Sequence, residues 1–362
     1  MQRAPDFSQA DQVIQKALEQ EVFPAACVLV GRREKVLFRR AYGRLSIEED
    51  AGLCNEQTRF DLASVSKPLA VGMLALRAME SGKLCLWDKL GTFIDAPADK
   101  QEITIAQILT HTAGFPPGLH LWQLARTPEQ STELILAAPL DFQPGTRVQY
   151  SCTGFILLGQ LLECIYGLPL NELALQEVFW PLKMKNTSYL PAGGNIASTE
   201  MQDDGFCLTG VVHDENARFL GGLSGNAGIF SDLCDMTRFV QMLALGGKLP
   251  DGTQFLSPAT LRAALVNRTP GAGHEFRGLG FNLAGSPSNF LGDLMSPRAY
   301  GHTGFTGTSI AVDPDTGLFV VLLTNRVCPT RENGKLIRMR SLIHNAAAAA
   351  AGRMQQEAPP WN

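Results

Sequence analysis

The segment that decides the fold of this chain is Phe60-Asp61-Leu62-Ala63-Ser64-Val65-Ser66-Lys67. Its first residues are typical of a strand, and helical spacing over 65–81 begins close to Ser64. Positions i and i+3 of a helix share a face, so Lys67 is expected beside the Ser64 hydroxyl. A serine at the start of a helix also lies near free backbone N–H groups. The segment therefore predicts a hydroxyl, an amine and N–H donors close together.

Such a trio suits nucleophilic catalysis. A free serine is a poor nucleophile and needs an adjacent base, and a lysine can be that base when burial or a neighbouring cation lowers its pKa. Backbone N–H groups can stabilise an oxyanion. Four-residue S-x-x-K matches also arise by chance, so Ser64 as a plain helix cap and Lys67 as a solvated side chain remain the alternative.

Two further motifs argue against chance. The segment 144–154, PGTRVQYSCTG, places Tyr150 on a loop just before an expected helix. The segment 301–307, GHTGFTG, lies on an expected strand, where its glycines permit close approach of a substrate backbone. An S-x-x-K motif, a mid-chain polar motif and a K-T-G-like motif form a recognised catalytic signature. Here all three occur in order.

On these motifs the sequence resembles the superfamily of penicillin-binding proteins and serine β-lactamases, in particular the group of class C β-lactamases, DD-peptidases and esterases. The likeness runs over roughly residues 8 to 345 and includes four lesser segments: 108–115, 181–187, 212–217 and 323–327. It implies an α/β plus all-α fold with the site in the groove between two lobes.

The resemblance also implies roles for individual residues. Ser64 becomes acylated, while Lys67 and Tyr150 shuttle its proton. A phenol titrates near ~10, so cationic neighbours, Lys67 first, are expected to lower the pKa of Tyr150. The oxyanion hole would be the backbone N–H groups of Ser64 and Phe305. The remaining residues implied to bind substrate are Cys152, His302, Thr303 and Gly304.

Two of these positions depart from the pattern of the superfamily. Cys152 stands where the tyrosine motif normally has asparagine, and a thiol is only a weak hydrogen-bond donor and acceptor. His302 stands where β-lactamases carry lysine. A histidine with an ordinary pKa near ~6.5 is mostly neutral at pH 7, so its attraction for a substrate carboxylate is expected to be weaker and to change with pH. Both departures count against an efficient β-lactamase and favour ester substrates.

The coarse pattern places strands near both ends of the chain and helices in the middle. The economical assembly is one antiparallel sheet flanked by the terminal helices, with a helical lobe inserted. The expected sheet domain is 1–62 with 205–362, and the expected helical lobe is 63–204. Expected strands are 25–30, 36–42, 299–303, 308–313 and 318–325; expected helices include 104–109, 131–137, 153–165, 171–178, 232–245 (capped by Ser231) and 335–351.

Other candidate residues have less support. His111 is expected in a structural turn, and His213-Asp214-Glu215 lacks the paired spacing of a metal site. Cys152 as a rival nucleophile paired with His302 remains a minor alternative. The segment 222–226 narrowly misses G-x-S-x-G and is expected to be a loop. No metal or cofactor is expected.

Composition limits the possible partners. The 362 residues are 45% hydrophobic with a net charge of −4, and no dense basic cluster points to nucleic acid. No apolar stretch is long enough for a membrane span or a signal peptide, which predicts a soluble, cytoplasmic protein; a periplasmic or secreted protein is the alternative if a signal peptide has been removed. Most of the eight cysteines are expected to be small buried hydrophobes in a reducing compartment. The oligomeric state is left open.

The leading hypothesis is therefore a carboxylesterase-like serine hydrolase acting on a small ester, amide or β-lactam. A D-Ala-D-Ala carboxypeptidase or weak β-lactamase is the first alternative. A penicillin-binding fold that binds ligand without turnover is the second, although joint retention of Ser64, Lys67 and Tyr150 argues against it.

Overall fold

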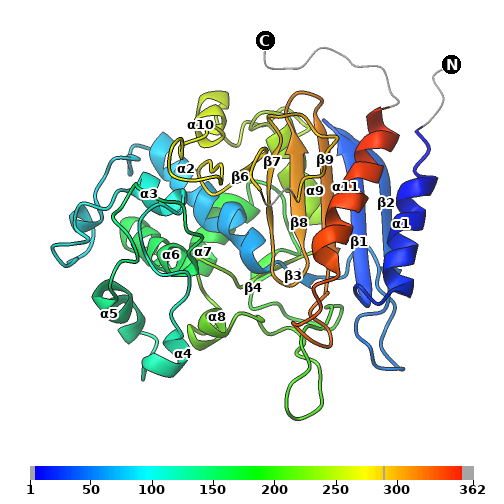
Figure 1. Cartoon of the computed structure of the whole chain (residues 1–362), viewed down its shortest axis with the longest axis horizontal. Coiled ribbons are helices and arrows are strands. Elements are labelled where there is room, and N and C mark those ends of the chain that lie inside the picture. The colour runs from blue at the N-terminus through cyan, green and yellow to red at the C-terminus, as the bar shows by residue number, and fades with distance from the viewer. Residues whose placement is uncertain (1–4, 288–289, 353–362) are drawn as a thin grey trace.

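A computed structural model of the chain describes residues 5–287 and 290–352. Its main feature is a six-stranded antiparallel sheet of order β2-β1-β9-β8-β7-β6 (Figure 1). The strands are β1 (Ala25–Arg32), β2 (Lys35–Gly43), β6 (Asn282–Leu283), β7 (Tyr300–Thr303), β8 (Ser309–Asp313) and β9 (Leu318–Thr324). Because β1 pairs with β9, the sheet joins the two ends of the chain, as the sequence predicts.

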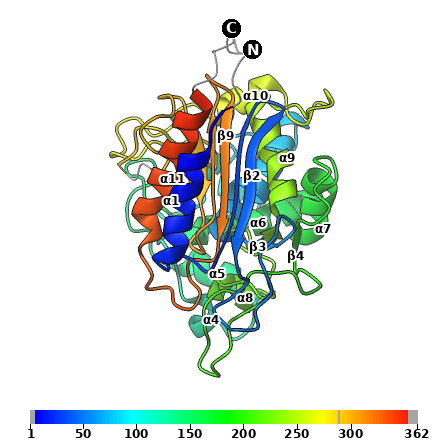
Figure 2. The ribbon, with the colours of Figure 1, turned by 90° about the vertical axis from the view of Figure 1, so that its right-hand side faces the viewer.

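Helices cover both faces of this sheet. The terminal helices α1 (Ser8–Glu19) and α11 (Leu336–Gly352) pack together on one face, and α9 (Leu233–Ala244) packs on the other (Figure 2). Strands β8 and β9 are consequently buried along their whole length. A strand covered on both faces is apolar on both faces, which explains the continuous run Leu-Phe-Val-Val-Leu-Leu in β9. The predicted mixed α/β architecture with terminal helices on the sheet is confirmed.

The middle of the chain forms the helical lobe, which lies beside the sheet in Figure 1. Its elements are α2 (Met73–Glu80), η3 (Leu90–Thr92), α3 (Ile105–Leu109), α4 (Leu121–Leu124), α5 (Gln130–Ala137), α6 (Cys152–Tyr166), α7 (Leu170–Ala174) and η4 (Leu175–Phe179). Two short helices come later in the chain: α8 (Glu215–Phe219) contacts α4, and α10 (Pro258–Ala264) packs on α2.

The helix expected over 65–81 is built in three parts. A 3₁₀ turn, η1 (Ala63–Val65), leads to the π-helix η2 (Lys67–Gly72), and regular α-helix starts only at Met73. Pro68 has no N–H to donate, which interrupts the regular ladder of hydrogen bonds at this point. The segment that carries Ser64 and Lys67 is therefore more tightly wound, and then wider, than an ordinary helix.

A second, three-stranded sheet was not predicted. It has the order β3-β5-β4, from β3 (Phe60–Asp61), β5 (Ile229–Ser231) and β4 (Ser188–Tyr189). This sheet holds the chain just before Ser64 against segments far away in the sequence. It takes strands from both expected domains, and the domain boundaries at 62/63 and 204/205 stay a prediction.

Two local expectations were wrong. Ser231 does not cap α9, because it is the last residue of β5; the Asp232 carboxylate caps the helix instead, accepting from the Asp235 N–H at 2.8 Å. Among the eight free cysteines, only Cys27, Cys54 and Cys328 are buried. Apolar flanking residues misled the prediction at positions such as Cys85, which lies in an exposed turn after α2.

Within the described residues no single helix is long and apolar enough to cross a membrane. Only α6 together with α7 and η4 reaches the required length and composition, and these helices are bent by 79° at their junction. Most of the apolar side chains of α6 pack in the core of the helical lobe.

Candidate active site

Ser64 and Lys67 lie side by side at the start of the helical lobe. The Lys67 Nζ atom donates a hydrogen bond to Ser64 Oγ at 3.0 Å. Ala63, immediately before the serine, has φ +46°, a left-handed conformation that costs energy for a residue with a side chain. The backbone is therefore strained where it presents the Ser64 hydroxyl.

The Lys67 ammonium is fully buried and all three of its N–H bonds have an acceptor. Besides Ser64 Oγ, it donates to Cys152 Sγ at 3.4 Å and to the Asn226 carbonyl at 2.9 Å. The Asn226 side chain is itself fixed, since it donates to Asp214 at 3.1 Å and accepts from Ser224 at 2.6 Å. These bonds fix the direction in which Lys67 points.

Tyr150 completes the group that surrounds Lys67. The Lys67 Nζ atom lies 4.9 Å from the centre of the Tyr150 ring, and the phenol oxygen is buried without a hydrogen-bond partner among the described residues. A buried hydroxyl in that condition costs free energy. The structure thus brings together the three residues that the sequence assigned to catalysis, and their roles remain a proposal.

His111 holds Tyr150 in place. Its carbonyl accepts from the Gln149 N–H at 2.9 Å, its Nδ1 atom accepts from the Ser151 N–H at 3.1 Å, and its ring lies 4.5 Å from the Tyr150 ring. Burial lowers the pKa of His111 well below its usual value, which keeps Nδ1 free of a proton and able to accept. His111 was expected to have a structural role, and these contacts show that the role is to position Tyr150.

The protonation of the Lys67–Tyr150 pair differs from the expectation. Burial alone lowers the pKa of Lys67, but Cys152 and Tyr150 outweigh it, so the pKa is raised. Burial raises the pKa of Tyr150 and outweighs the opposing effect of Lys67. Lys67 lowers the pKa of Tyr150 as expected, but the net pKa is raised, because desolvation of the phenolate is the larger effect. The resting pair is an ammonium and a neutral phenol.

The third motif is tied directly to the backbone before Ser64. The hydroxyls of Thr306 and Thr308 donate to the carbonyls of Asp61 and Leu62 at 2.7 and 2.8 Å. A Cβ atom at Gly304 would lie 2.4 Å from the Leu62 carbonyl oxygen, so only glycine fits there. This close approach brings the turn that contains Phe305 next to the turn that contains Ser64, as a shared oxyanion hole requires.

His302 is not the titrating group that the sequence suggested. It is 2% exposed, Nδ1 lies 2.8 Å from the Thr303 carbonyl, and Nε2 is buried without a partner among the described residues. Burial, with help from Lys67 and Arg277, lowers its pKa to about 3. His302 is therefore neutral near pH 7 and does not supply a cation at the position of the β-lactamase lysine.

Arg277 is the cation that sequence analysis missed. Its guanidinium is buried, lies 5.6 Å from the centre of the Tyr150 ring, and bonds to Glu275 and Asn282. Nothing in the local sequence marks Arg277, because it reaches Tyr150 only through the fold. Asn226 was also missed, although the near match to G-x-S-x-G at 222–226 had drawn attention to its loop.

The segment His213-Asp214-Glu215 supports the third motif. The His213 ring stacks on Phe305 at 5.7 Å and its Nε2 atom lies 3.0 Å from Glu200, which pairs with Arg331. Asp214 caps α8 and holds Asn226. In the part of the chain that the structure describes, no three His, Cys, Asp or Glu side chains are grouped as metal ligands.

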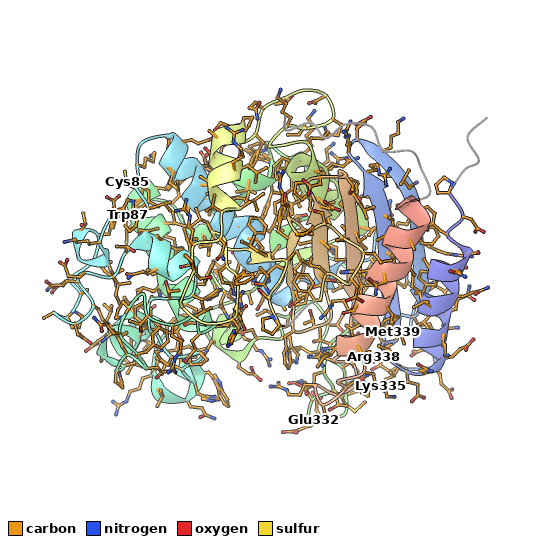
Figure 3. All side chains as sticks on the ribbon, turned by 45° about the horizontal axis from the view of Figure 1, so that its top comes forward. Cys85, Trp87, Glu332, Lys335, Arg338 and Met339 are labelled. Carbon is orange, nitrogen blue, oxygen red and sulfur yellow. The ribbon has the colours of Figure 1, made fainter. Side chains whose placement is uncertain are left out.

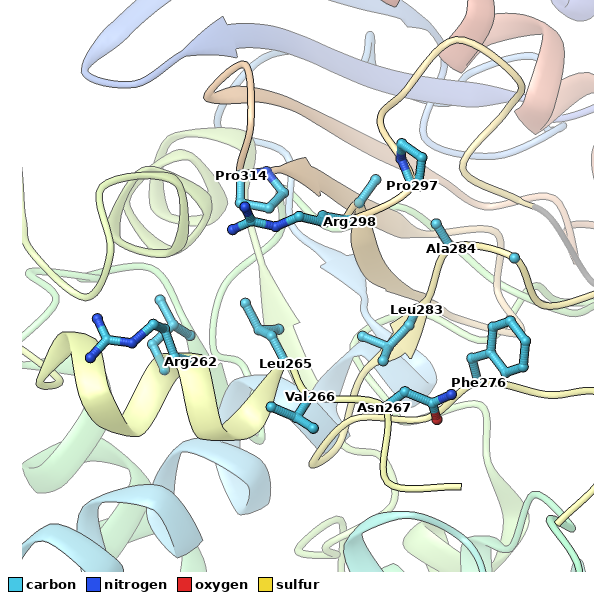
Figure 4. Close-up of a pocket in the computed structure, with 13 residues that line it drawn as sticks. Arg262, Leu265, Val266, Asn267, Phe276, Leu283, Ala284, Pro297, Arg298 and Pro314 are labelled. Carbon is cyan, nitrogen blue, oxygen red and sulfur yellow. The ribbon is translucent and has the colours of Figure 1, made fainter. Parts of the chain in front are cut away.

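An apolar groove lies elsewhere on the molecule. It has a volume of about 590 Å³ between α10 and strand β6, with Leu265, Val266 and Leu283 on its walls (Figure 4). None of the predicted site residues lines it. Phe276, which lines this groove, directly precedes Arg277 in the sequence.

A serine that follows a strained alanine, is hydrogen-bonded to a buried lysine and lies beside a tyrosine, between a sheet and a helical lobe, is typical of the acyl-transferring serine hydrolases of the penicillin-binding type. The chain belongs to the Beta-lactamase family, whose profile matches residues 10–343. It is thus a serine hydrolase of this family, as the resemblance implied.

The names of related proteins refer to several different activities. The chain is 30% identical over 357 residues to an N-acetylmuramyl-L-alanine amidase of Bacillus subtilis (strain 168), covering 87% of this chain and 80% of that protein. It is also 30% identical to a candidate D-alanyl-D-alanine carboxypeptidase of Escherichia coli (strain K12), covering 84% and 79%.

The solved structures agree on the fold. EstCE1, described as a hydrolase with promiscuous acyltransferase activity, superposes with a TM-score of 0.76 at 24% identity, covering 94% of this chain and 97% of that one. A β-lactamase/D-alanine carboxypeptidase from Pseudomonas syringae superposes with a TM-score of 0.73 at 20% identity, covering 92% and 98%.

Proposed function

We propose that this protein hydrolyses small carboxylic esters through an acyl-enzyme on Ser64. The observation that carries the proposal is the 3.0 Å hydrogen bond between Lys67 and Ser64, with Cys152 as a further acceptor of the same ammonium. The thiol cannot offer a substrate amide the carbonyl and NH₂ of an asparagine. An ester needs neither of these hydrogen bonds, and its leaving group is an alcohol, which is easier to expel than an amine.

The reaction uses the groups in a fixed order. Ser64 Oγ attacks the acyl carbon while its proton passes to the Lys67–Tyr150 pair, which must first have lost one proton. The backbone N–H groups of Ser64 and Phe305 hold the oxyanion. The pair then returns the proton to the leaving oxygen, and the alcohol departs. A water molecule then attacks the acyl carbon in the same way. The carboxylic acid is released and Ser64 is restored.

A second candidate function is removal of a carboxyl-terminal residue from a peptide, as in D-Ala-D-Ala carboxypeptidases. Two observations favour it: the names of the curated relatives and the buried guanidinium of Arg277 beside Tyr150. A free carboxylate on the leaving group could pair with Arg277. A β-lactamase activity would be weak, because His302 is neutral.

A matched set of substrates distinguishes these functions. We would measure kcat/KM for p-nitrophenyl esters, for a D-Ala-D-Ala peptide and for nitrocefin under one condition. Higher kcat/KM for the esters supports the first proposal, and higher kcat/KM for the peptide supports the second. The cytoplasmic location is also a proposal, and cell fractionation tests it.

A further inference from the structure

Helix α11 buries polar side chains against the sheet, and several of their polar atoms lack a hydrogen-bond partner in the described chain. Arg340 and His344, one turn apart, are 8% and 0% exposed. The Nε atom of Arg340 and both ring nitrogens of His344 have no hydrogen-bond partner among the described residues. Ser309 Oγ, on β8, is in the same condition. Such atoms cost free energy unless a water or a ligand meets them.

These groups lie on the same side of the sheet. Ser309 is paired in register with Leu322, and directly paired residues share a face. Leu322 belongs to the same buried cluster as Leu336 and Ile343 of α11, so Ser309 is on the face of the sheet that this helix covers. Arg326 is close to the same end of α11, because a Cβ atom at Gly307 would lie 3.1 Å from both Arg326 Cγ and Leu336. We call Arg326, Arg340, His344 and Ser309 the α11 polar cluster.

The cluster contains two cations that have no counter-ion among residues 5–287 and 290–352. Arg326 donates only to backbone carbonyls, those of Phe305, Arg331 and Asn333, and Arg340 makes no hydrogen bond or ion pair with any described residue. Burial, followed by the charge of Arg326, lowers the pKa of Arg340 to about 10, so it is charged near neutral pH. Arg340 keeps only 8% of its surface exposed, and a largely buried charge is more stable when a counter-ion pairs with it.

We propose that the α11 polar cluster is a binding site for a small monovalent inorganic anion, such as chloride. The guanidinium of Arg340, the hydroxyl of Ser309 and an N–H of neutral His344 are hydrogen-bond donors for it, and the two arginines supply the charge. Ordered water could satisfy the same hydrogen bonds, but it would leave both charges unpaired.

The site lies behind the third catalytic motif. Arg326 Nε donates to the Phe305 carbonyl at 2.8 Å, and its guanidinium covers the Phe305 ring at 4.6 Å. An anion that holds the two arginines together therefore stabilises the turn that carries the predicted oxyanion donor. The inference does not depend on which substrate the enzyme uses.

The first test is thermal unfolding in sodium chloride against sodium gluconate at equal ionic strength. Raising chloride from 1 to 200 mM should raise Tm of the wild type by about 2–5 °C, as expected for a ligand that binds only the folded state. Arg340→Met should lose this increment. Arg338→Met is the matched control, because Arg338 is exposed on the same helix (Figure 3), and it should keep the increment. Equal chloride dependence in wild type and Arg340→Met would overturn the proposal.

A crystal of the wild type grown in bromide is the second test, and it does not depend on a variant that folds. Anomalous scattering at the bromine edge should show a peak within hydrogen-bond distance of Arg340. Density for water alone, with no anomalous peak there, would also overturn the proposal.

Discussion

The ammonium of Lys67 lies 3.0 Å from the hydroxyl oxygen of Ser64, and the lysine is the donor in this hydrogen bond. A charged lysine cannot accept the serine proton, and Tyr150 beside it is held as a neutral phenol. The resting site therefore has one proton more than the attacking state requires. This excess proton underlies two of the predictions below.

Replacing Ser64 with alanine should abolish turnover and covalent labelling by a fluorophosphonate. A nucleophile that works as a unit with its base contributes several orders of magnitude, so activity should fall at least about a thousandfold. The far-UV circular dichroism and Tm should stay close to wild type, because Ser64 is only half-buried. If the variant keeps a tenth of the wild-type rate, Ser64 is not the nucleophile.

Lys67→Ala and Tyr150→Phe should each be severe, and the double variant should be little worse than either. Residues that share one proton transfer are strongly non-additive. The comparison is kcat/KM of the two single variants and the double variant on one ester, with the exposed Lys185→Ala as a control that keeps activity. Multiplicative losses in the double variant would mean that the two residues serve separate steps.

The rate should rise with pH across the neutral range. The pKa values of Lys67 and Tyr150 are both raised, so the form that can accept the serine proton is a minor species at pH 7 and grows as pH increases. For a neutral ester, kcat/KM should increase by roughly tenfold per pH unit from about pH 6 to 8. A plateau already reached at pH 6 would show that the pair loses its proton more easily than the structure implies.

Cys152→Asn should shift substrate preference from esters towards peptides. Asparagine restores an amide that can bond to a substrate amide and to Lys67, and one or two such bonds contribute roughly 0.5–1.5 kcal/mol each. The ratio of peptide to ester kcat/KM should rise on the order of tenfold. Cys164→Asn, an exposed change on the same helix, should leave the ratio unchanged. Cys152→Ser should keep ester hydrolysis; its loss would favour the thiol as nucleophile.

Recognition of a substrate carboxylate should depend on Arg277 and not on the charge of His302. Because the pKa of His302 is about 3, its ring stays neutral from pH 8 to pH 6, and KM for an anionic ester should show no fall over this range beyond that of a matched neutral ester. Arg277→Met should raise KM for the anionic ester by about tenfold relative to the neutral one. Arg298→Met, at the rim of the apolar groove, is the control. Equal effects of Arg277→Met on both esters would exclude a role for Arg277 in carboxylate recognition.

Local patterns in the sequence determined the fold class and the three motifs. The alternation and apolar runs at 25–43 and 299–325 predicted the strands of the main sheet. A strand can be recognised from the types of a few neighbouring side chains, without knowledge of distant segments. The spacing of Ser64 and Lys67 predicted their contact, because a single turn of helix is enough to bring them together.

Tertiary structure alone decided the chemical state of those residues. Arg277 is 127 positions from Tyr150 in the numbering (277 − 150), and only the packing of the two lobes brings its charge to the ring. The pKa of His302 fell far below the value for free histidine, and that of Tyr150 rose, because desolvation depends on everything packed around a group. Sequence names the groups that can ionise, whereas burial by distant segments determines which of them carry a charge.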